Sequence, residues 1–174
     1  MNEVLQAMKA RRSCRKYKPD AVPQEKLDAV LEAGLYAASG RGQQAAICIA
    51  VTDRETRDAL SEVNREIGGW PAPFDPFYGA PTVIAVLADR SRPTFVYDGS
   101  LVMGNLMLAS HAVGLGSCWI HRAKETFERE EGKALLRALG IEGDWEGVGF
   151  CILGVPDGSR PEPPERKAGR IYRK

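Results

Sequence analysis

Apolar residues surround most of the circumference of the stretch from Tyr97 to Val113 when it is read as a helix. The apolar positions are Leu101, Val102, Leu106, Met107, Leu108, Ala109, Ala112 and Val113. A helix that is apolar on most sides is buried on most sides, so the pattern predicts a central helix. Gly114 follows as a candidate left-handed residue that ends this helix. So large an apolar surface exceeds what one small domain covers, and it therefore predicts a homodimer.

Shorter apolar patterns on both sides predict the rest of the fold. Thr52 to Glu55 match a capping box at the start of a helix, and Gly68-Gly69 would end that helix. Gly140 would end the last helix of the chain. Helical spacing indicates helices over residues 2–10, 23–38, 53–67 and 127–139, and apolar runs rich in β-branched residues indicate strands at 46–51, 80–89, 117–120 and 148–155. This order predicts a single α+β domain, residues 1–174, with a sheet of about four strands covered by helices. The polar, proline-rich tail (residues 156–174) predicts no core element.

Charge is balanced over the chain but concentrated at its two ends. The formal net charge is +1, which gives no support for binding nucleic acid or a membrane through overall charge. Residues 1–19 carry six Lys and Arg against one Glu, and the tail carries six against three acidic residues. A helix dipole favours Arg11 and Arg12 near a helix C-terminus, but it does not account for the whole cluster. An anion such as a phosphate would relieve the repulsion most simply.

The remaining composition narrows the class of protein further. The first 13 residues are amphipathic and charged where a signal peptide would be apolar, and the apolar runs are too short to span a bilayer. The four cysteines form no CxxC pair, and the two histidines lie ten residues apart. Disulfide-scaffold and metal-site interpretations are therefore weak, and we expect a cytoplasmic protein with reduced thiols and no metal.

Three irregular segments carry candidate binding chemistry. Residues 114–117 would present backbone N–H groups to a polar ring edge or a phosphate, and residues 37–44 form a polar, glycine-bearing loop. An ordinary tight turn and a plain loop are the alternatives. The aromatic loop, defined as residues 68–79, holds four of the 13 aromatic residues and three of the 11 prolines. These aromatic side chains need an apolar surface, which is the protein core, a flat ligand or a partner subunit.

Five motifs in this order match one known family. They are RRSCRKY at 11–17, SGRGQQ at 39–44, APTVIAV at 80–86, DGSLVMGNLMLASHAVGLGSCWI at 98–120 and RKAGR at 166–170. Over nearly its whole length the chain resembles the nitroreductase family of FMN-dependent oxidoreductases, in its compact single-domain form. The resemblance implies a mostly antiparallel sheet of four to five strands and a homodimer with two FMN molecules in its interface.

The resemblance also assigns roles to single residues. It implies an N-terminal motif that holds the FMN phosphate and flanks the flavin pyrimidine: Arg11, Arg12, Ser13 and Arg15. It implies C-terminal cations that complete the phosphate site: Arg166 and Lys167, with Arg170 as a third candidate. It implies a segment whose backbone packs on one flavin face and offers an N–H near N5: Ile120, His121 and Arg122. Ser39 and Gln44 match a loop from the other subunit. The family pattern of that loop, P-S-x-x-N-x-Q-P-W, is changed here at Ala38, Gly42, Ala45 and Ala46, which predicts a more open pocket.

The expected reaction is hydride transfer from NAD(P)H to flavin N5 and then to a flat, electron-poor acceptor, a nitroaromatic or a quinone, in ping-pong order. No side chain is predicted as a catalytic acid, because protons can come from water. The predicted lid over the acceptor consists of Trp70, Phe74, Phe77 and Tyr78. The alternatives are an FMN carrier or sensor without turnover, and a dehalogenating or flavin-modifying member of the same fold. A nucleic-acid patch is disfavoured because the aromatic residues are not interleaved with the cations.

Overall fold

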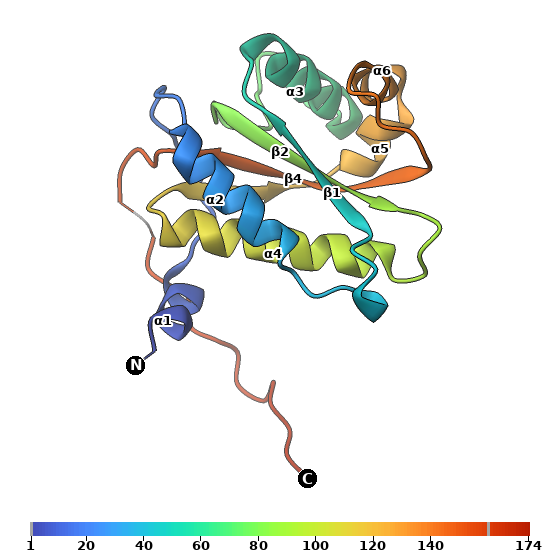
Figure 1. Ribbon diagram of the computed structural model, residues 1–174. Helices are drawn as coiled ribbons and strands as arrows, with labels where there is room; N and C mark the ends of the chain where they lie inside the picture. Colours follow the sequence, from blue (N-terminus) through green and yellow to red (C-terminus); the bar gives the residue numbers. More distant parts are fainter. Residues whose placement is uncertain (1, 160) are drawn as a thin grey trace.

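The chain folds into three layers, with helices on both faces of one sheet (Figure 1). This computed structural model describes residues 2–159 and 161–174. The elements are α1 (Glu3–Ala10), α2 (Gln24–Leu35), the 3-10 turn η1 (Gly40–Gly42), β1 (Ala46–Val51), α3 (Arg54–Gly68), β2 (Thr82–Asp89), α4 (Phe95–Ala112), β3 (Gly116–Ile120), α5 (Ala123–Glu128), α6 (Glu130–Ala138) and β4 (Trp145–Gly154). Helices α2 and α4 cover one face of the sheet, and α3, α5 and α6 cover the other.

The sheet has four strands in the order β1-β2-β4-β3, and each neighbouring pair is antiparallel. The predicted α+β class and strand number are confirmed. The register between β2 and β4 shifts at Val86/Leu87, which leaves Val148 as a bulge residue. Val148 then packs on α4 at Gly99, where a Cβ atom would lie 2.6 Å from Val148 Cγ2. Glycine at this position therefore allows the close approach of helix and sheet.

Each face of the sheet has its own apolar core. On the α3 and α5 side the core includes Leu60, Phe77, Phe127 and Phe150, and on the α2 and α4 side it includes Val30, Met103, Leu106 and Leu115. Strand β2 is buried from Thr82 to Ala88 because it has packed helices on both faces. This explains why its sequence is continuously apolar where a half-exposed strand would alternate.

Two helix boundaries differ from the predictions. Asp53, and not Thr52, caps α3, because its Oδ1 accepts a hydrogen bond from the Thr56 N–H at 2.8 Å. The predicted last helix is two helices, α5 and α6, separated by the extended backbone of Arg129. Gly132 packs there against the α5 backbone, where a Cβ would lie 2.4 Å from the Thr126 oxygen. The predicted helix ends at Gly69, Gly114 and Gly140 are confirmed, and the left-handed backbone predicted for Gly114 occurs at all three.

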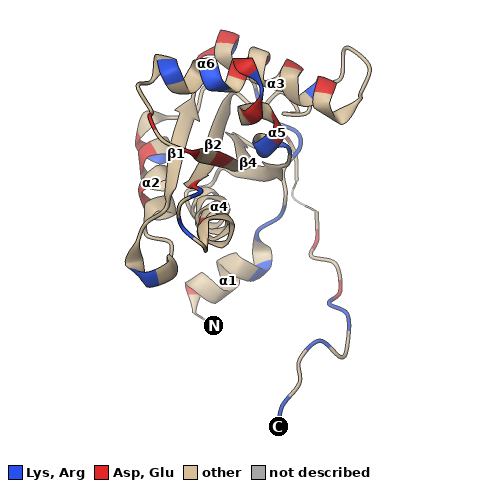
Figure 2. Ribbon diagram, turned by 90° about the vertical axis from the view of Figure 1, so that its right-hand side faces the viewer, with Lys and Arg blue, Asp and Glu red and all other residues tan. Residues whose placement is uncertain are grey.

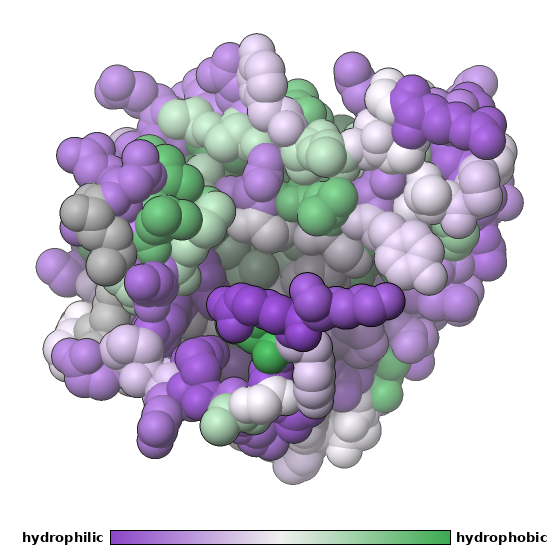
Figure 3. Space-filling view, turned by 90° about the horizontal axis from the view of Figure 1, so that it is seen from below, coloured by the Kyte–Doolittle hydropathy of each residue, from purple (hydrophilic) through white to green (hydrophobic). Residues whose placement is uncertain are grey.

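Within one chain, α4 is buried only on the side that faces the sheet and α2. Its opposite side leaves Tyr97 72% and Leu101 50% exposed, and the apolar side chains of α1 are also exposed. Viewed from below, this face shows apolar side chains gathered among hydrophilic ones around a hollow (Figure 3). We predicted that α4 is buried on most sides. In the single chain it is buried on one side only.

The tail leaves the domain and runs past α1 (Figure 1). Residues 161–174 are exposed and form no helix or strand, as predicted. Arg160, one of the counted tail cations, lies outside the described residues. No helix within the described part of the chain is long and apolar enough to cross a membrane.

Candidate flavin site

The N-terminal cationic motif lies beside the glycine turn that follows α4. Ser13 forms a parallel bridge with Ser117, and the Cys14 N–H donates to the Ser117 carbonyl at 2.9 Å. At Gly116 a Cβ atom would lie 2.8 Å from both Cβ and Sγ of Cys14, so the contact requires glycine. Lys and Arg follow one another along this segment between α1 and the sheet (Figure 2). The motifs at 11–17 and 98–120 are thus adjacent in space.

Two arginines of this motif hold buried nitrogen atoms without partners. Arg12 donates from Nη1 to the Arg11 carbonyl and from Nη2 to the Lys9 carbonyl, so it caps the end of α1. Arg11 Nη1 and Arg12 Nε are buried and have no hydrogen-bond partner within the described residues. A buried charged donor without an acceptor costs free energy. These atoms therefore suit an anionic ligand such as a phosphate.

The turn after β3 is held from two sides. Ile120 is buried in the core, whereas His121 is exposed. The His121 carbonyl accepts a hydrogen bond from Nδ2 of the fully buried Asn64 at 2.8 Å. Arg122 has a left-handed backbone, with φ 75° and ψ 17°, and its carbonyl accepts from the N–H and Oγ1 of Thr126. A strained non-glycine conformation fixed in this way is typical of a functional site.

The predicted loop of Ser39 and Gln44 lies at the other end of α4. Asp98, buried in the first turn of α4, accepts from the Gly40 N–H at 2.9 Å and from Thr94 Oγ1 at 3.0 Å. Ser39 Oγ accepts from the Gln44 N–H at 3.0 Å. Helix α4 has 18 residues, so about 27 Å separate its ends at 1.5 Å per residue. A single chain therefore does not bring Ser39 and Gln44 to the N-terminal motif.

A cavity of about 90 Å³ borders this loop. Its lining includes Ser39 and Gln44 together with Ala38, Ala45 and Ala46. These three alanines are positions where the family pattern has proline, proline and tryptophan. The cavity therefore lies where this sequence has small side chains in place of larger ones.

The described part of one chain shows no contact between the C-terminal cations and the N-terminal motif, so the phosphate-binding role of Arg166 and Lys167 stays a prediction. The tail is attached at its start, where Lys16 Nζ lies 2.8 Å from Asp157 Oδ2. Farther along, Arg166 donates only to the Pro164 carbonyl among the described residues. The tail extends away from its own domain (Figure 2), and its apolar residues Ile171 and Tyr172 are exposed.

Burial removes one residue from the predicted aromatic lid. Phe77 is fully buried, with its ring centroid 5.2 Å from that of Phe150, so it is a core residue and not a lid residue. Its place in the lid was wrong because apolar core residues can occur inside an irregular loop. One ring face of Trp70 carries the Arg122 guanidinium at 4.4 Å, and Tyr78 carries that of Arg15 at 5.9 Å. Phe74 is 37% exposed and is the most accessible of the four.

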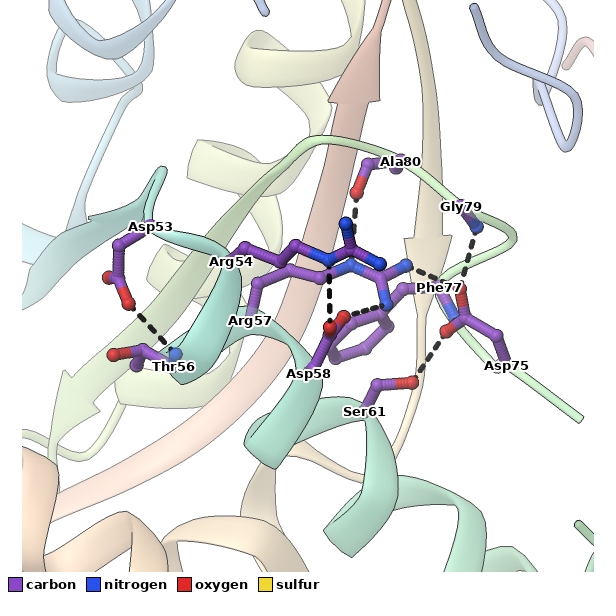
Figure 4. Close-up of polar contacts among 10 residues, drawn as sticks. All are labelled: Asp53, Arg54, Thr56, Arg57, Asp58, Ser61, Asp75, Phe77, Gly79 and Ala80. Carbon is purple, nitrogen blue, oxygen red and sulfur yellow. Dashed lines mark hydrogen bonds and ion pairs between the residues drawn. The ribbon is translucent and has the colours of Figure 1, made fainter. Parts of the chain in front are cut away.

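Asp75 fixes the aromatic loop to α3 (Figure 4). Its carboxylate accepts from Arg57 Nη2 at 2.5 Å, from Ser61 Oγ at 2.5 Å, and from the N–H groups of Phe77 and Gly79. Burial acts to raise the pKa of Asp75, but these hydrogen bonds outweigh it and hold the pKa below its usual value.

A groove of about 980 Å³ runs beside this network, between residues 19–24 and the start of α3. Each arginine that lines it is paired with a carboxylate: Arg54 with Asp58, Arg57 with Asp58 and Asp75, and Arg65 with Glu62. The groove therefore offers no unpaired cation to an anionic ligand.

Sequence reasoning missed three residues that support the site, namely Asp98, Asn64 and Asp75. Asp98 and Asn64 had a readable signal, because each is a polar residue on the side of its helix that carries the buried apolar residues. Such residues are buried when they satisfy backbone groups elsewhere. Asp75 had no such signal, since it lies in a loop without a regular period and its side-chain partners, Arg57 and Ser61, come from α3.

Comparison with known proteins decides the family. Residues 8–68 and 70–155 match the model of the Nitroreductase family. The chain belongs to the nitroreductase family. Two curated relatives match in part: a Methanothermobacter thermautotrophicus protein, 35% identical over 67% of this chain and 60% of its own length, and the Bacillus subtilis FMN reductase (NAD(P)H), 38% identical over 67% of this chain and 53% of its own. The chain thus spans little more than half the length of these relatives.

A solved structure matches the nitroreductase fold from end to end. It is a Bacteroides fragilis nitroreductase with bound FMN, which is 29% identical, covers 100% of both chains and has a TM-score of 0.88. A Desulfitobacterium hafniense nitroreductase with bound FMN, 22% identical, has a TM-score of 0.89 and supports the fold alone. The predicted family and fold are confirmed.

Proposed function

We propose that this chain is an FMN-dependent oxidoreductase that takes hydride from NAD(P)H and reduces a flat, electron-poor acceptor such as a nitroaromatic or a quinone. The observation that carries the proposal is the pair of buried, unpartnered nitrogen atoms of Arg11 and Arg12 beside the Gly116 turn. A phosphate ester would supply the acceptors that these atoms lack. The similarity to an FMN-bound nitroreductase supports FMN as the source of that phosphate.

The proposed site requires a homodimer. Its two predicted halves lie at opposite ends of α4, which exposes Tyr97 and Leu101 along the side between them. Gly104 on the same helix has no atom within 4 Å of its Cβ position. Two copies packed antiparallel along α4 would cover this apolar side and bring residues 39–44 of one to residues 11–15 of the other. The tail with Arg166 and Lys167 would then reach the second copy.

FMN, when bound, supplies the hydride acceptor at N5 and returns the electrons to the second substrate. The protein supplies orientation and electrostatics. Cations at Arg11, Arg12 and Arg15 would stabilise the negative charge that develops on reduction. The fixed turn at His121 and Arg122 would orient a backbone N–H toward the ring. Phe74, and not Phe77, would border the acceptor.

A visible spectrum of the purified protein tests the cofactor, and light scattering tests the dimer. NAD(P)H oxidation with and without a nitroaromatic or quinone tests the reaction. We expect a yellow dimer that releases FMN on denaturation, with parallel double-reciprocal plots, because donor and acceptor use one space in turn. Bound FMN without acceptor-dependent oxidation would favour the carrier or sensor alternative. Failure to bind FMN on addition would reject the proposal.

A further inference from the structure

The aromatic loop forms a continuous row of rings that ends in an arginine on each side. The centroids of Trp70 and Phe74 are 5.1 Å apart, and those of Phe74 and Tyr78 are 6.0 Å apart. Arg122 lies over the outer ring at the Trp70 end, and Arg15 lies over Tyr78. Arg15 belongs to the N-terminal motif already assigned to the cofactor. The guanidinium of Arg122, in contrast to that of Arg15, has no assigned role.

The Trp70 ring holds the guanidinium of Arg122 in place, but the N–H groups of this guanidinium donate no hydrogen bond within the described residues. Among residues 2–159 and 161–174 it has no ion pair and no hydrogen bond, and it stacks on the Trp70 ring. Neighbouring arginines differ, because Arg129 pairs with Glu66, and Arg65 pairs with Glu62 and donates to the Trp70 carbonyl. A guanidinium stacked on an indole keeps its N–H groups directed sideways, so they can bind an anion.

The backbone of Arg122 places this cation beside the expected site of hydride transfer. Asn64 and Thr126 hold the turn from both sides, and the side chain leads from it to Trp70. A ligand that reaches this turn with its reactive ring would bring its charged groups past the guanidinium. NAD(P)H has this composition, with a neutral dihydronicotinamide joined to phosphates.

We propose that Arg122 binds a phosphate group of the nicotinamide dinucleotide and so determines specificity for charged hydride donors, with Trp70 as its positioning residue. This inference rests on the proposed function, since it assumes that NAD(P)H is the donor. It gives the side chain of Arg122 a role that is separate from the backbone contact expected at the same residue. It also gives Trp70 a role other than stacking on the acceptor.

The test compares donors that differ in charge, using the FMN-loaded dimer. Wild type, Arg122→Met, Trp70→Leu and Trp70→Phe are assayed with NADPH, NADH and the uncharged donor 1-benzyl-1,4-dihydronicotinamide. Arg122→Met is expected to lower kcat/KM for NADPH or NADH by roughly 10- to 100-fold through KM, and to lower kcat/KM for the benzyl donor by a much smaller factor. Trp70→Leu should reduce the preference for charged donors by a smaller factor. Trp70→Phe should retain most of this preference. Arg129→Met is the matched control, because this nearby arginine is already paired with Glu66.

Binding of NADP⁺ provides a readout that needs no turnover. Calorimetry should show affinity lowered by roughly the same factor in Arg122→Met and unchanged in Arg129→Met. Equal losses for charged and uncharged donors, or unchanged NADP⁺ affinity, would overturn the assignment of Arg122. A wild-type protein that none of the three donors reduces would instead reject the proposed function, while the NADP⁺ measurement would still decide the role of Arg122.

Discussion

Arg57 of α3 and Asp75 of the aromatic loop form an ion pair, with Nη2 2.5 Å from Oδ2. The guanidinium also donates from Nε to the Ala80 carbonyl at 3.0 Å, so it joins the two ends of the segment from Asp75 to Ala80. The loop that carries the exposed Phe74 is therefore fixed by charge and hydrogen bonds as well as by its prolines.

Replacing Asp75 with Asn should make this anchor independent of pH. The pKa of Asp75 is lowered in the folded protein, so its contribution is present above the unfolded pKa of about 3.9 and is lost as pH falls through the lower folded pKa. We expect a loss of about 2 kcal/mol in unfolding free energy at pH 7, and a difference from wild type that shrinks below about pH 4. Urea unfolding across this range measures both. Asp58→Asn, at the exposed partner of Arg57, should cost less, and a difference that persists unchanged to pH 2 would contradict the role of Asp75.

Replacing Arg11 with Gln should separate cofactor affinity from stability. The variant loses a charged donor to the proposed phosphate, so FMN affinity should fall roughly 10- to 100-fold. The cofactor-free protein should melt no lower than wild type, because a buried unpaired guanidinium nitrogen is removed. Fluorescence titration and thermal unfolding measure the two effects. Arg54→Gln in the groove is the control, and unchanged FMN affinity in Arg11→Gln would remove Arg11 from the site.

Replacing Leu101 with Arg should give a monomer. Leu101 is 50% exposed in the single chain on α4, and Leu139, after α6 on the other side of the sheet, is 52% exposed. Only Leu101 lies on the proposed interface, where a charge would be buried unpaired. Light scattering should report a monomer with weakened FMN binding for Leu101→Arg and a dimer for Leu139→Arg. A dimeric Leu101→Arg protein would exclude α4 from the interface.

Phe74 and Phe77 should respond differently to truncation. Phe77→Ala empties a fully buried position and should cost about 3–5 kcal/mol of stability. Phe74→Ala should change stability little and raise the acceptor KM, because the ring lies at the surface of the loop. Thermal unfolding and steady-state kinetics with the acceptor test the pair. Identical acceptor kinetics in wild type and Phe74→Ala would leave Phe74 a packing residue only.

Periodic apolar residues predicted most of the fold, because burial against a sheet imposes a regular spacing. The helical spacing of α2 and α3 was readable for this reason, whereas β2 was readable as a continuous apolar run and the helix ends at positions 69, 114 and 140 as glycines. The split between α5 and α6 was not, since it depends on Gly132 packing on the Thr126 backbone. Contacts between distant backbone segments have no local signal in the sequence.

The candidate site was readable where a motif fixed both residue type and neighbour. The motifs around Ser13 and Ser117 were expected together and do form a bridge. The lid was predicted only from the aromatic composition of residues 68–79. Composition did not distinguish the buried Phe77 from the exposed Phe74. The stacking of Arg122 on Trp70 joins residues far apart in the chain, and no pattern along the sequence indicates it.

The bridge between Ser13 and Ser117 has a consequence for how the protein is made. The cationic segment is synthesised first, but its hydrogen-bonding partners, the Ser117 and Val155 carbonyls, belong to the last parts of the domain to leave the ribosome. During translation the strongly basic segment therefore lacks these backbone hydrogen bonds until β3 and β4 have emerged. Contacts between residues so far apart in sequence form late and slowly. The proposed anion site at Arg11 and Arg12 would thus form only after the final strand is complete.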